Sequence, residues 1–330
     1  MPSFVILVLV SGFQNGVGSD YFSYMDIYNG DVDELTRFFL RGEYLFYYIF
    51  KFIIDAKLGE QTIFLVSSFF NTLALFLFLY WLKKKGCKLC FIIFCFLVVT
   101  NIYHNQMNGI RQYMGLMLFP LMYTLLIDRK LVSYVFLSII ATFFHSTAVV
   151  GFLLLPMYFL FLKTHRRLVI LLFFLSLGFY LLCSPLVDIV VENYFKTYIH
   201  YLSSDYGAGL PISVTLTRVY YLPIFLFCLY VYYKTCDDER IYNDFIGFGI
   251  LVWAVTYWMF ILYISFGFFY RISVYYFIFY IFPLYYLYRY LVLHKKFFLL
   301  VFIAIYLFFP YFLKTIAFPK GVFLYNSIVF

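Results

Sequence analysis

Residues 62–82 read TIFLVSSFFNTLALFLFLYWL and are followed directly by Lys83, Lys84 and Lys85. No charged residue interrupts this stretch, and about 20 apolar residues in a helix are enough to cross the hydrocarbon core of a bilayer. Basic residues at the end of such a stretch are typical of a cytoplasmic boundary. We therefore predict a transmembrane helix that runs from the outer to the inner face.

The composition of the whole chain agrees with this helix. Hydrophobic residues make up 65% of the 330 residues, charged residues 12% and aromatic residues 26%. A soluble domain is about 45–50% apolar and about 25% charged, and the interior of a globule of this size cannot hide the excess. The composition excludes a soluble enzyme, a disordered chain and a nucleic-acid-binding protein.

The net charge of +8 gives the orientation of the chain, because its basic residues are concentrated in short gaps between apolar stretches. Basic gaps alternate with gaps that are poor in Lys and Arg, as the positive-inside rule requires. Further spans are expected over 89–104, 109–127, 131–144, 147–162, 168–184, 213–233, 245–266, 270–288 and 297–313. The prediction is an all-α, polytopic membrane protein with about 10–11 transmembrane or re-entrant helices, one membrane domain over 1–330 and no soluble domain.

This topology leaves four outer segments, at 14–61, 104–111, 185–212 and 314–330. The first contains an apolar stretch at 43–54 that is too short to span, so we expect an interfacial or re-entrant helix there. The segment 185–212 is expected to be a periplasmic loop.

Three arginines are expected near the outer ends of separate spans, although a charged side chain within a span costs about 2.5–3.5 kcal/mol on insertion scales. They are Arg111, Arg218 and Arg271. Each could extend toward the outer headgroups. Together, they would form a basic pocket open to the outer leaflet, suited to phosphate or pyrophosphate because Arg binds these groups through two parallel hydrogen bonds.

Two further polar groups stand out against the apolar background. His145 lies with Ser146 at the tip of the helical pair 131–144 and 147–162; it could satisfy a backbone carbonyl, act as a general base or hydrogen-bond a sugar. In the first outer segment, Asp20, Tyr24 and Glu43 combine carboxylates with aromatic rings, a pattern that suits carbohydrate, although acids in outer loops are also commonly just solvated.

The motifs for several other chemistries are missing from the sequence. It has no G-x-x-x-x-G-K-[ST], H-E-x-x-H or G-x-S-x-G motif. Cys87 and Cys90 form a C-x-x-C pair without the second ligand pair that zinc would need. We expect neither a metal site nor a cofactor.

A family resemblance is carried by five segments in a fixed order. They are GFQNGVGSDYFSYMDIY (12–28), GEYLFYYIFKFI (42–53), NGIRQYMGLMLF (108–119), ATFFHSTAVVGFLL (141–154) and FYRISVYYF (269–277). In this order they resemble the EpsG family of bacterial polysaccharide polymerases, which overlaps with the Wzy-type O-antigen polymerases. The resemblance runs from about residue 11 to residue 313; one departure is Gln14, where the family often has Arg.

The resemblance implies a metal-independent glycosyltransferase with a GT-C-like architecture in the bacterial inner membrane. It would join undecaprenyl-pyrophosphate-linked repeat units at the periplasmic face, in the synthesis of O-antigen, capsule or exopolysaccharide. A chain-length-regulating co-polymerase is a partner that this function admits, besides the lipid bilayer and the lipid-linked glycans.

The residues can be assigned roles in that reaction. Arg111, Arg218 and Arg271 would stabilise the departing pyrophosphate. His145, Asp20 and Glu43 are alternative candidates for the base that activates the acceptor hydroxyl. Further substrate contacts are expected from Gln112, Tyr113, Tyr24 and Ser146.

Two other functions stay open at this point. Intramembrane arginines would also suit a flippase for lipid-linked oligosaccharide, although the chain lacks the internal repeat usual in transporters. The second open function is that of a membrane acyltransferase with His145 as its base. The sequence does not specify the sugars, the linkage or the oligomeric state.

Overall fold

We describe the fold from a computed structural model of the chain, which describes residues 2–194, 212–262, 271–319 and 323–328. The chain divides into two compact units: Met1–Leu153 with Tyr311–Phe330, and Leu154–Pro310. Each unit is described by itself. The outer segment predicted at 185–212 falls largely at 195–211, outside the described residues.

Helices form the regular structure of the described chain, as the continuous apolar stretches predict. Seven of the described helical segments are long and apolar enough to cross a membrane. They are Thr62–Lys84, Ile110–Ile127, Ser146–Lys163, Leu216–Thr235, Asp244–Ile261, Arg271–Leu293 and Phe297–Ala317, and shorter apolar helices cover Pro2–Gly12, Leu89–Val98, Leu131–Phe144 and Leu168–Leu182. The protein is therefore an all-α, multi-pass membrane protein, and the predicted fold class is confirmed.

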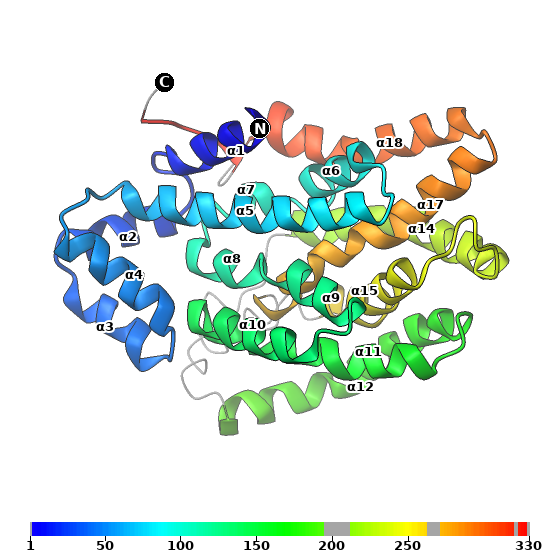
Figure 1. Ribbon diagram of the computed structural model, residues 1–330, viewed down its shortest axis with the longest axis horizontal. Coiled ribbons are helices and arrows are strands. Elements are labelled where there is room, and N and C mark those ends of the chain that lie inside the picture. The colour runs from blue at the N-terminus through cyan, green and yellow to red at the C-terminus, as the bar shows by residue number, and fades with distance from the viewer. Residues whose placement is uncertain (1, 195–211, 263–270, 320–322, 329–330) are drawn as a thin grey trace. The chain divides into compact units, whose positions relative to one another are not determined.

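The first unit is organised along the long helix α5 (Thr62–Lys84), which α1 (Pro2–Gly12) follows side by side (Figure 1). Gly12 allows the close approach, since a Cβ at that position would lie 2.7 Å from Leu65 Cδ2. The hydroxyl of Ser11 donates to that of Ser68 at 2.7 Å. Small residues and hydroxyl bonds at a helix crossing are typical of packing within a membrane, where lipid is as apolar as the helices themselves.

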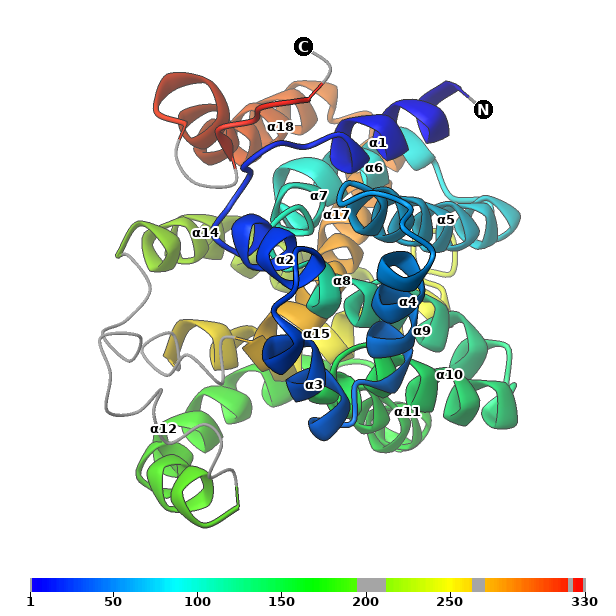
Figure 2. The same ribbon diagram turned by 90° about the vertical axis from the view of Figure 1, so that its left-hand side faces the viewer.

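Three short helices precede α5 and fall within the outer segment predicted at 14–61. They are α2 (Asp20–Tyr28), α3 (Val32–Leu40) and α4 (Tyr44–Asp55). Phe46 and Phe50 of α4 are fully buried, and Tyr24 of α2 packs its ring on both. The apolar stretch predicted at 43–54 is thus a helix, and Figure 2 looks onto this group with α8 behind it.

The rest of the first unit consists of broken helices, joined by short turns. They are α6 (Leu89–Val98), α7 (Ile102–Asn105), α8 (Ile110–Leu116), α9 (Phe119–Ile127), α10 (Leu131–Phe144), the 3₁₀-helix η1 (Ser146–Leu153) and the π-helix η5 (Leu313–Ala317). The span predicted over 89–104 is not one helix. Asn101 adopts φ +54, and the Thr100 hydroxyl donates to the Phe96 carbonyl at 2.6 Å and accepts from the Ile102 N–H. A left-handed residue with side-chain bonds to the backbone ends a helix.

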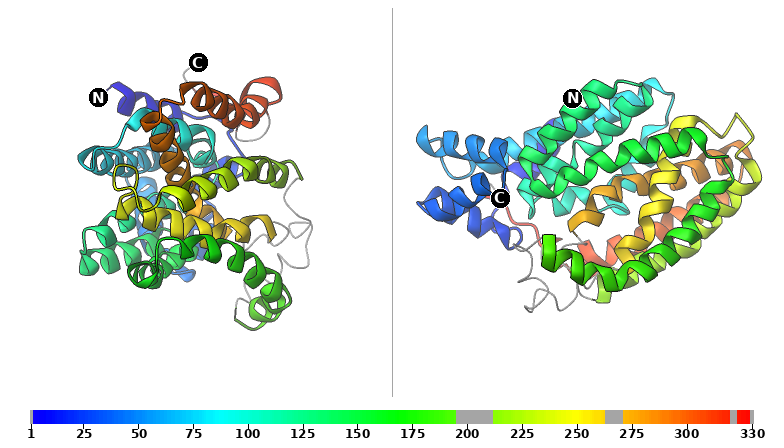
Figure 3. Two further views of the ribbon diagram at one scale, coloured as in Figure 1. Left: turned by 90° about the vertical axis from the view of Figure 1, so that its right-hand side faces the viewer. Right: turned by 90° about the horizontal axis from the view of Figure 1, so that it is seen from below.

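The second unit contains long helices built around buried aromatic residues. They are α11 (Leu154–Lys163), α12 (Leu168–Tyr194), α14 (Ile212–Thr235), α15 (Asp244–Leu262), the 3₁₀-helix η4 (Val274–Tyr280), α17 (Ile281–Leu293) and α18 (Phe297–Phe312), whose last residues fall in the first unit. Helix α15 packs along α12 and α17 (Figure 3). Trp253 of α15 is fully buried, with the rings of Phe173 and Phe225 at 5.2 and 4.9 Å.

Candidate functional site

The candidate site lies in the first unit, where a turn of the outer segment contacts α8 and the α10–η1 junction. The turn joins α3 to α4. The Glu43 N–H donates to the Phe38 carbonyl at 3.0 Å, the Gly42 N–H donates to the Phe39 carbonyl at 3.0 Å, and Gly42 has φ +79. This is the Schellman pattern that ends a helix with a left-handed glycine. It fixes Phe38 and Glu43 close together.

Glu43 is the centre of the site. It occupies the N-cap position of α4, yet its side chain makes no capping bond and extends to other helices. Its Oε1 lies 2.6 Å from His145 Nδ1 and accepts from the Ser146 N–H at 3.1 Å and the Ser146 hydroxyl at 3.3 Å. Its Oε2 forms an ion pair with Arg111 Nη1 at 2.8 Å.

The position of His145 follows from a sharp break in the chain. Helix α10 ends at Phe144, and His145 is extended, with φ −153 and ψ 125, before η1 begins at Ser146. The Tyr134 hydroxyl donates to the Gly151 carbonyl at 2.7 Å, which ties η1 back against α10. The tip of this helical pair therefore presents both the His145 ring and the Ser146 N–H to the Glu43 carboxylate.

Arg111 is held on two sides by the same turn. Besides its ion pair with Glu43, its guanidinium carbon lies 4.2 Å from the centre of the Phe38 ring. It is the second residue of α8, and Tyr24 of α2 is hydrogen-bonded to its backbone. Burial raises the pKa of the Tyr24 phenol, so Tyr24 stays neutral beside the charged groups.

The electrostatics of the cluster keep Glu43 ionised. Burial alone would raise the pKa of the Glu43 carboxyl, but the charges of His145 and Arg111 and the bonds from His145 and Ser146 outweigh burial and hold it at about 2. An ionised carboxylate only accepts hydrogen bonds, so the proton between it and His145 belongs to Nδ1. The basic lone pair of a neutral His145 ring is then on Nε2.

Side-chain exposure increases from Glu43 at 0% through His145 at 5% to Arg111 at 14%. A fully buried carboxylate with its oxygens engaged does not meet a substrate, whereas the groups that surround it lie nearer the surface of the unit. In this geometry Glu43 can orient His145, whose Nε2 is the ring nitrogen able to accept a proton.

Asp20, the third base candidate, is anchored in a different way. Its backbone N–H donates to Asn108 Oδ1 at 3.0 Å, just before α8 begins. Gly18, with φ +79, is needed there because a Cβ would overlap the Asn108 side chain. The contact fixes the start of α2 against the start of α8. Gln112 and Tyr113, predicted as substrate contacts, follow Arg111 on α8 as a half-buried and a buried side chain.

Arg218 and Arg271 belong to the second unit. Arg218 of α14 is 4% exposed, and its guanidinium carbon lies 4.2, 5.1 and 5.4 Å from the ring centres of Phe277, Phe260 and Tyr280. Arg271 is half-buried and comes shortly before η4. The convergence of these two arginines with Arg111 stays a prediction.

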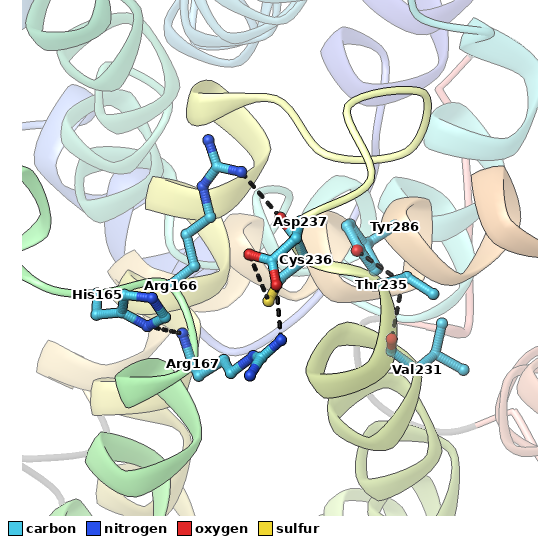
Figure 4. Close-up of polar contacts among 8 residues, drawn as sticks. All are labelled: His165, Arg166, Arg167, Val231, Thr235, Cys236, Asp237 and Tyr286. Atoms are coloured by element: carbon cyan, nitrogen blue, oxygen red, sulfur yellow. Dashed lines mark hydrogen bonds and ion pairs between the residues drawn. The ribbon is translucent and has the colours of Figure 1, made fainter.

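A second group of charged residues joins two loops of the second unit (Figure 4). Arg166 Nη1 donates to the Cys236 carbonyl at 3.0 Å, and Arg167 forms an ion pair with Asp237 at 2.7 Å. Arg166 also stacks on the Tyr242 ring. These contacts connect the α11–α12 turn to the loop after α14, in two of the basic gaps assigned to the cytoplasmic face. The group fits a role in holding helix ends together. No cluster of three potential metal ligands from His, Cys, Asp and Glu occurs among the residues that the structure describes.

Sequence reasoning missed Phe38 and the link between Glu43 and His145. The signal for Phe38 was weak, because it is one of 47 phenylalanines. Its place four residues before Gly42 and five before Glu43 would have suggested a helix-ending turn that brings it near the carboxylate.

Comparison with known proteins identifies the family. The chain matches the family model described as the EpsG family over residues 1–327. No curated protein and no solved structure shows significant similarity to it. The chain belongs to the EpsG family, whose members are Wzy-like polymerases, and it is a polysaccharide-polymerase-like membrane protein.

Proposed function

We propose that this EpsG-family chain polymerises lipid-diphosphate-linked oligosaccharide repeat units at the outer, periplasmic face of the bacterial inner membrane. The observation that carries the proposal is the contact of His145 Nδ1 with the ionised Glu43 carboxylate at 2.6 Å. A histidine oriented in this way by a carboxylate is suited to take a proton from a hydroxyl.

The reaction is a glycosyl transfer. An acceptor hydroxyl at the non-reducing end of a new repeat unit attacks the anomeric carbon of the growing chain. The bond from that carbon to the diphosphate oxygen breaks, and the lipid diphosphate leaves with the electron pair. The acceptor's proton passes to His145 Nε2. A single displacement of this kind inverts the configuration at the anomeric carbon.

The remaining residues are assigned by what they can offer the substrate. Arg218 and Arg271 are proposed to stabilise the diphosphate as its negative charge develops, because guanidinium groups bind such oxygens without reorganising during the reaction. Tyr24, Gln112, Tyr113, Ser146 and Asp20 are proposed to line the sugar-binding region around the dyad. The undecaprenyl nature of the lipid and the sugar type belong to the proposal as well.

The length of surface polysaccharide in a deletion strain tests this function. Complementation with the wild-type chain should restore a ladder of lengths, and complementation with His145→Gln should leave single repeat units at the surface. Membrane insertion of the variant is checked by immunoblotting of membrane fractions.

The same assay separates the alternatives. Deletion of a flippase removes surface units altogether, and deletion of an acyltransferase leaves normal lengths with altered substituents. Either pattern, or a full ladder from the His145→Gln strain, would contradict the proposal.

A further inference from the structure

Arg111 contacts a carboxylate that also contacts His145, and this shared contact bears on its role. Oε1 of Glu43 is engaged by His145 and Ser146, while Oε2 is paired with Arg111 Nη1 at 2.8 Å. Glu43 itself is completely buried. The charges of Arg111 and His145 therefore act on each other through one carboxylate, over a short distance and away from water, where they are weakly screened.

A buried carboxylate beside a histidine affects the protonation state of that histidine. An unbalanced Glu43 would favour the positively charged form of His145, and a histidine that already holds a proton cannot accept one from a hydroxyl. The guanidinium on the other carboxylate oxygen supplies the balancing charge. With it in place, the group carries no net charge while the His145 ring is neutral.

The contacts of Arg111 hold its guanidinium group in one position. The Phe38 ring covers one face of its guanidinium, and the residue that donates this ring precedes Glu43 in the same hydrogen-bonded turn. An arginine that binds a diphosphate presents its fork of donors to the ligand. Arg111 instead directs Nη1 to Glu43 at 2.8 Å.

We propose that Arg111 is a positioning residue that acts through Glu43: its charge keeps His145 neutral and oriented, ready to receive the acceptor's proton. The proposal rests on the function proposed above and refines the sequence-based role of Arg111 as a diphosphate ligand. In this proposal the two units have different roles in the reaction. The first unit activates the acceptor hydroxyl, and the arginines of the second unit are the candidates for the diphosphate.

The other charged and titratable groups around the dyad are few. From α2 come Asp20 and the neutral Tyr24, and Tyr113 comes from α8. Tyr134 of α10 donates to the Gly151 carbonyl, and η1 has no titratable side chain. In α3 and α4, Arg37 pairs with Glu34 and Lys51 with Asp55, and Asp33 is exposed. Arg41, in the turn, is exposed.

The test is the pH dependence of kcat/KM for extension of a synthetic lipid-diphosphate repeat by purified protein. In Arg111→Met the acidic limb should move to higher pH by about one to two units, because a compensating charge next to the dyad is lost. Arg111→Lys should return the limb close to its wild-type position. The matched control is Arg37→Met, which removes an exposed arginine of α3 and should leave the profile unchanged.

A double variant keeps the test decisive if Arg111→Met folds poorly. Glu43→Gln with Arg111→Met removes both charges, so its acidic limb should lie above that of Glu43→Gln alone, in which the positive charge of Arg111 is left without its carboxylate beside His145. An arginine that binds diphosphate predicts a higher KM for the lipid-diphosphate substrate with the acidic limb unmoved in both variants. That result would overturn the proposal.

A readout without turnover separates this inference from the proposed function. The ring of His145 can be followed by NMR with ¹⁵N-labelled histidine, and its signal is assigned by comparison with His145→Gln, since the chain has 5 histidines. The titration midpoint of His145 should rise in Arg111→Met and not in Arg37→Met. A wild-type protein that makes no polymer would refute the polymerase alone, and an unmoved titration would refute the role of Arg111 alone.

Discussion

At the scale of single residues, the proposed mechanism depends on the buried carboxylate of Glu43. Glu43 lies between the half-buried Gly42 and the exposed Tyr44, yet its own side chain is 0% exposed. Burial of an ion costs free energy unless charges and hydrogen bonds compensate it. His145, Ser146 and Arg111 supply that compensation, so loss of Glu43 affects both stability and the base.

Glu43→Gln should change the dependence of stability on pH. The pKa of the carboxyl is about 2 in the folded protein against an ordinary value of 4.5. A depressed pKa stabilises the fold above pH 4.5, and the contribution is lost as pH falls toward 2. Thermal unfolding of the detergent-solubilised protein should show this loss in the wild type and a flatter profile in the variant. Asp33→Asn, at an exposed acid of α3, is the control. Equal slopes in wild type and Glu43→Gln would contradict the burial of an ionised Glu43.

Sequence alone singled out the residues of the candidate site but not which of them contact one another. Arg111, His145, Ser146 and Glu43 stood out because polar residues are costly in apolar surroundings. Which of these residues contact one another depends on the turn between α3 and α4. This turn places Glu43 beside His145, which lies 102 positions further along the chain. A turn of this kind has no long-range signature in the sequence. The three carboxylate and histidine candidates for the base were therefore equivalent until the structure placed them.

At the scale of elements, the site depends on how the α3–α4 turn is built. Gly42 has φ +79, and a Cβ added there would meet nothing within 4 Å. A substitution at this position therefore acts through the backbone alone. Gly86, after α5, has the same φ of +79, the same open surroundings and the same pair of bonds, Gly86 N–H to Lys83 and Cys87 N–H to Leu82.

Gly42→Ala should impair polymerisation much more than Gly86→Ala. Each forces a left-handed conformation on a residue with a Cβ and costs on the order of 1 kcal/mol. Only the first strains the turn that holds Glu43 and Phe38, so its kcat should fall by about tenfold or more, as expected when a catalytic geometry is misplaced. Extension rates and unfolding temperatures of both variants check this. Equal activity at equal stability would show that the turn does not position the site.

At the scale of the whole molecule, hydropathy predicted the helical class and seven of the ten spans, because backbone groups in lipid must be hydrogen-bonded within the segment, as they are in a helix. The predicted spans at 89–104, 131–144 and 168–184 correspond to shorter apolar helices. Interruptions were harder to predict: the break at Asn101 arises from local side-chain bonds within an apolar stretch, and the 3₁₀-helix η1 lies within another such stretch. The convergence of three arginines and the single domain stay predictions, since hydropathy does not specify how helices pack against one another.

The orientation of the chain is tested at the two ends of α5. In a cysteine-free background, Lys57→Cys, before α5, should react with a membrane-impermeant maleimide in intact spheroplasts. Lys84→Cys, at its far end, should react only after permeabilisation, because the positive-inside rule predicts that the basic gap is cytoplasmic. Both side chains are exposed in the structure. The reverse labelling pattern would place the α3–α4 turn, and with it the site, on the cytoplasmic side.

The most direct test of the central claim, that His145 supported by Glu43 activates an acceptor sugar, is extension of a synthetic lipid-diphosphate repeat by the purified wild-type protein and by His145→Gln. The account predicts a ladder of products with inverted linkages from the wild type and, from an equally well folded His145→Gln, the loss of roughly 10²–10⁴-fold in rate that removal of a general base causes. A wild-type protein that releases only unextended repeats, or a His145→Gln variant that extends them at the wild-type rate, would contradict it.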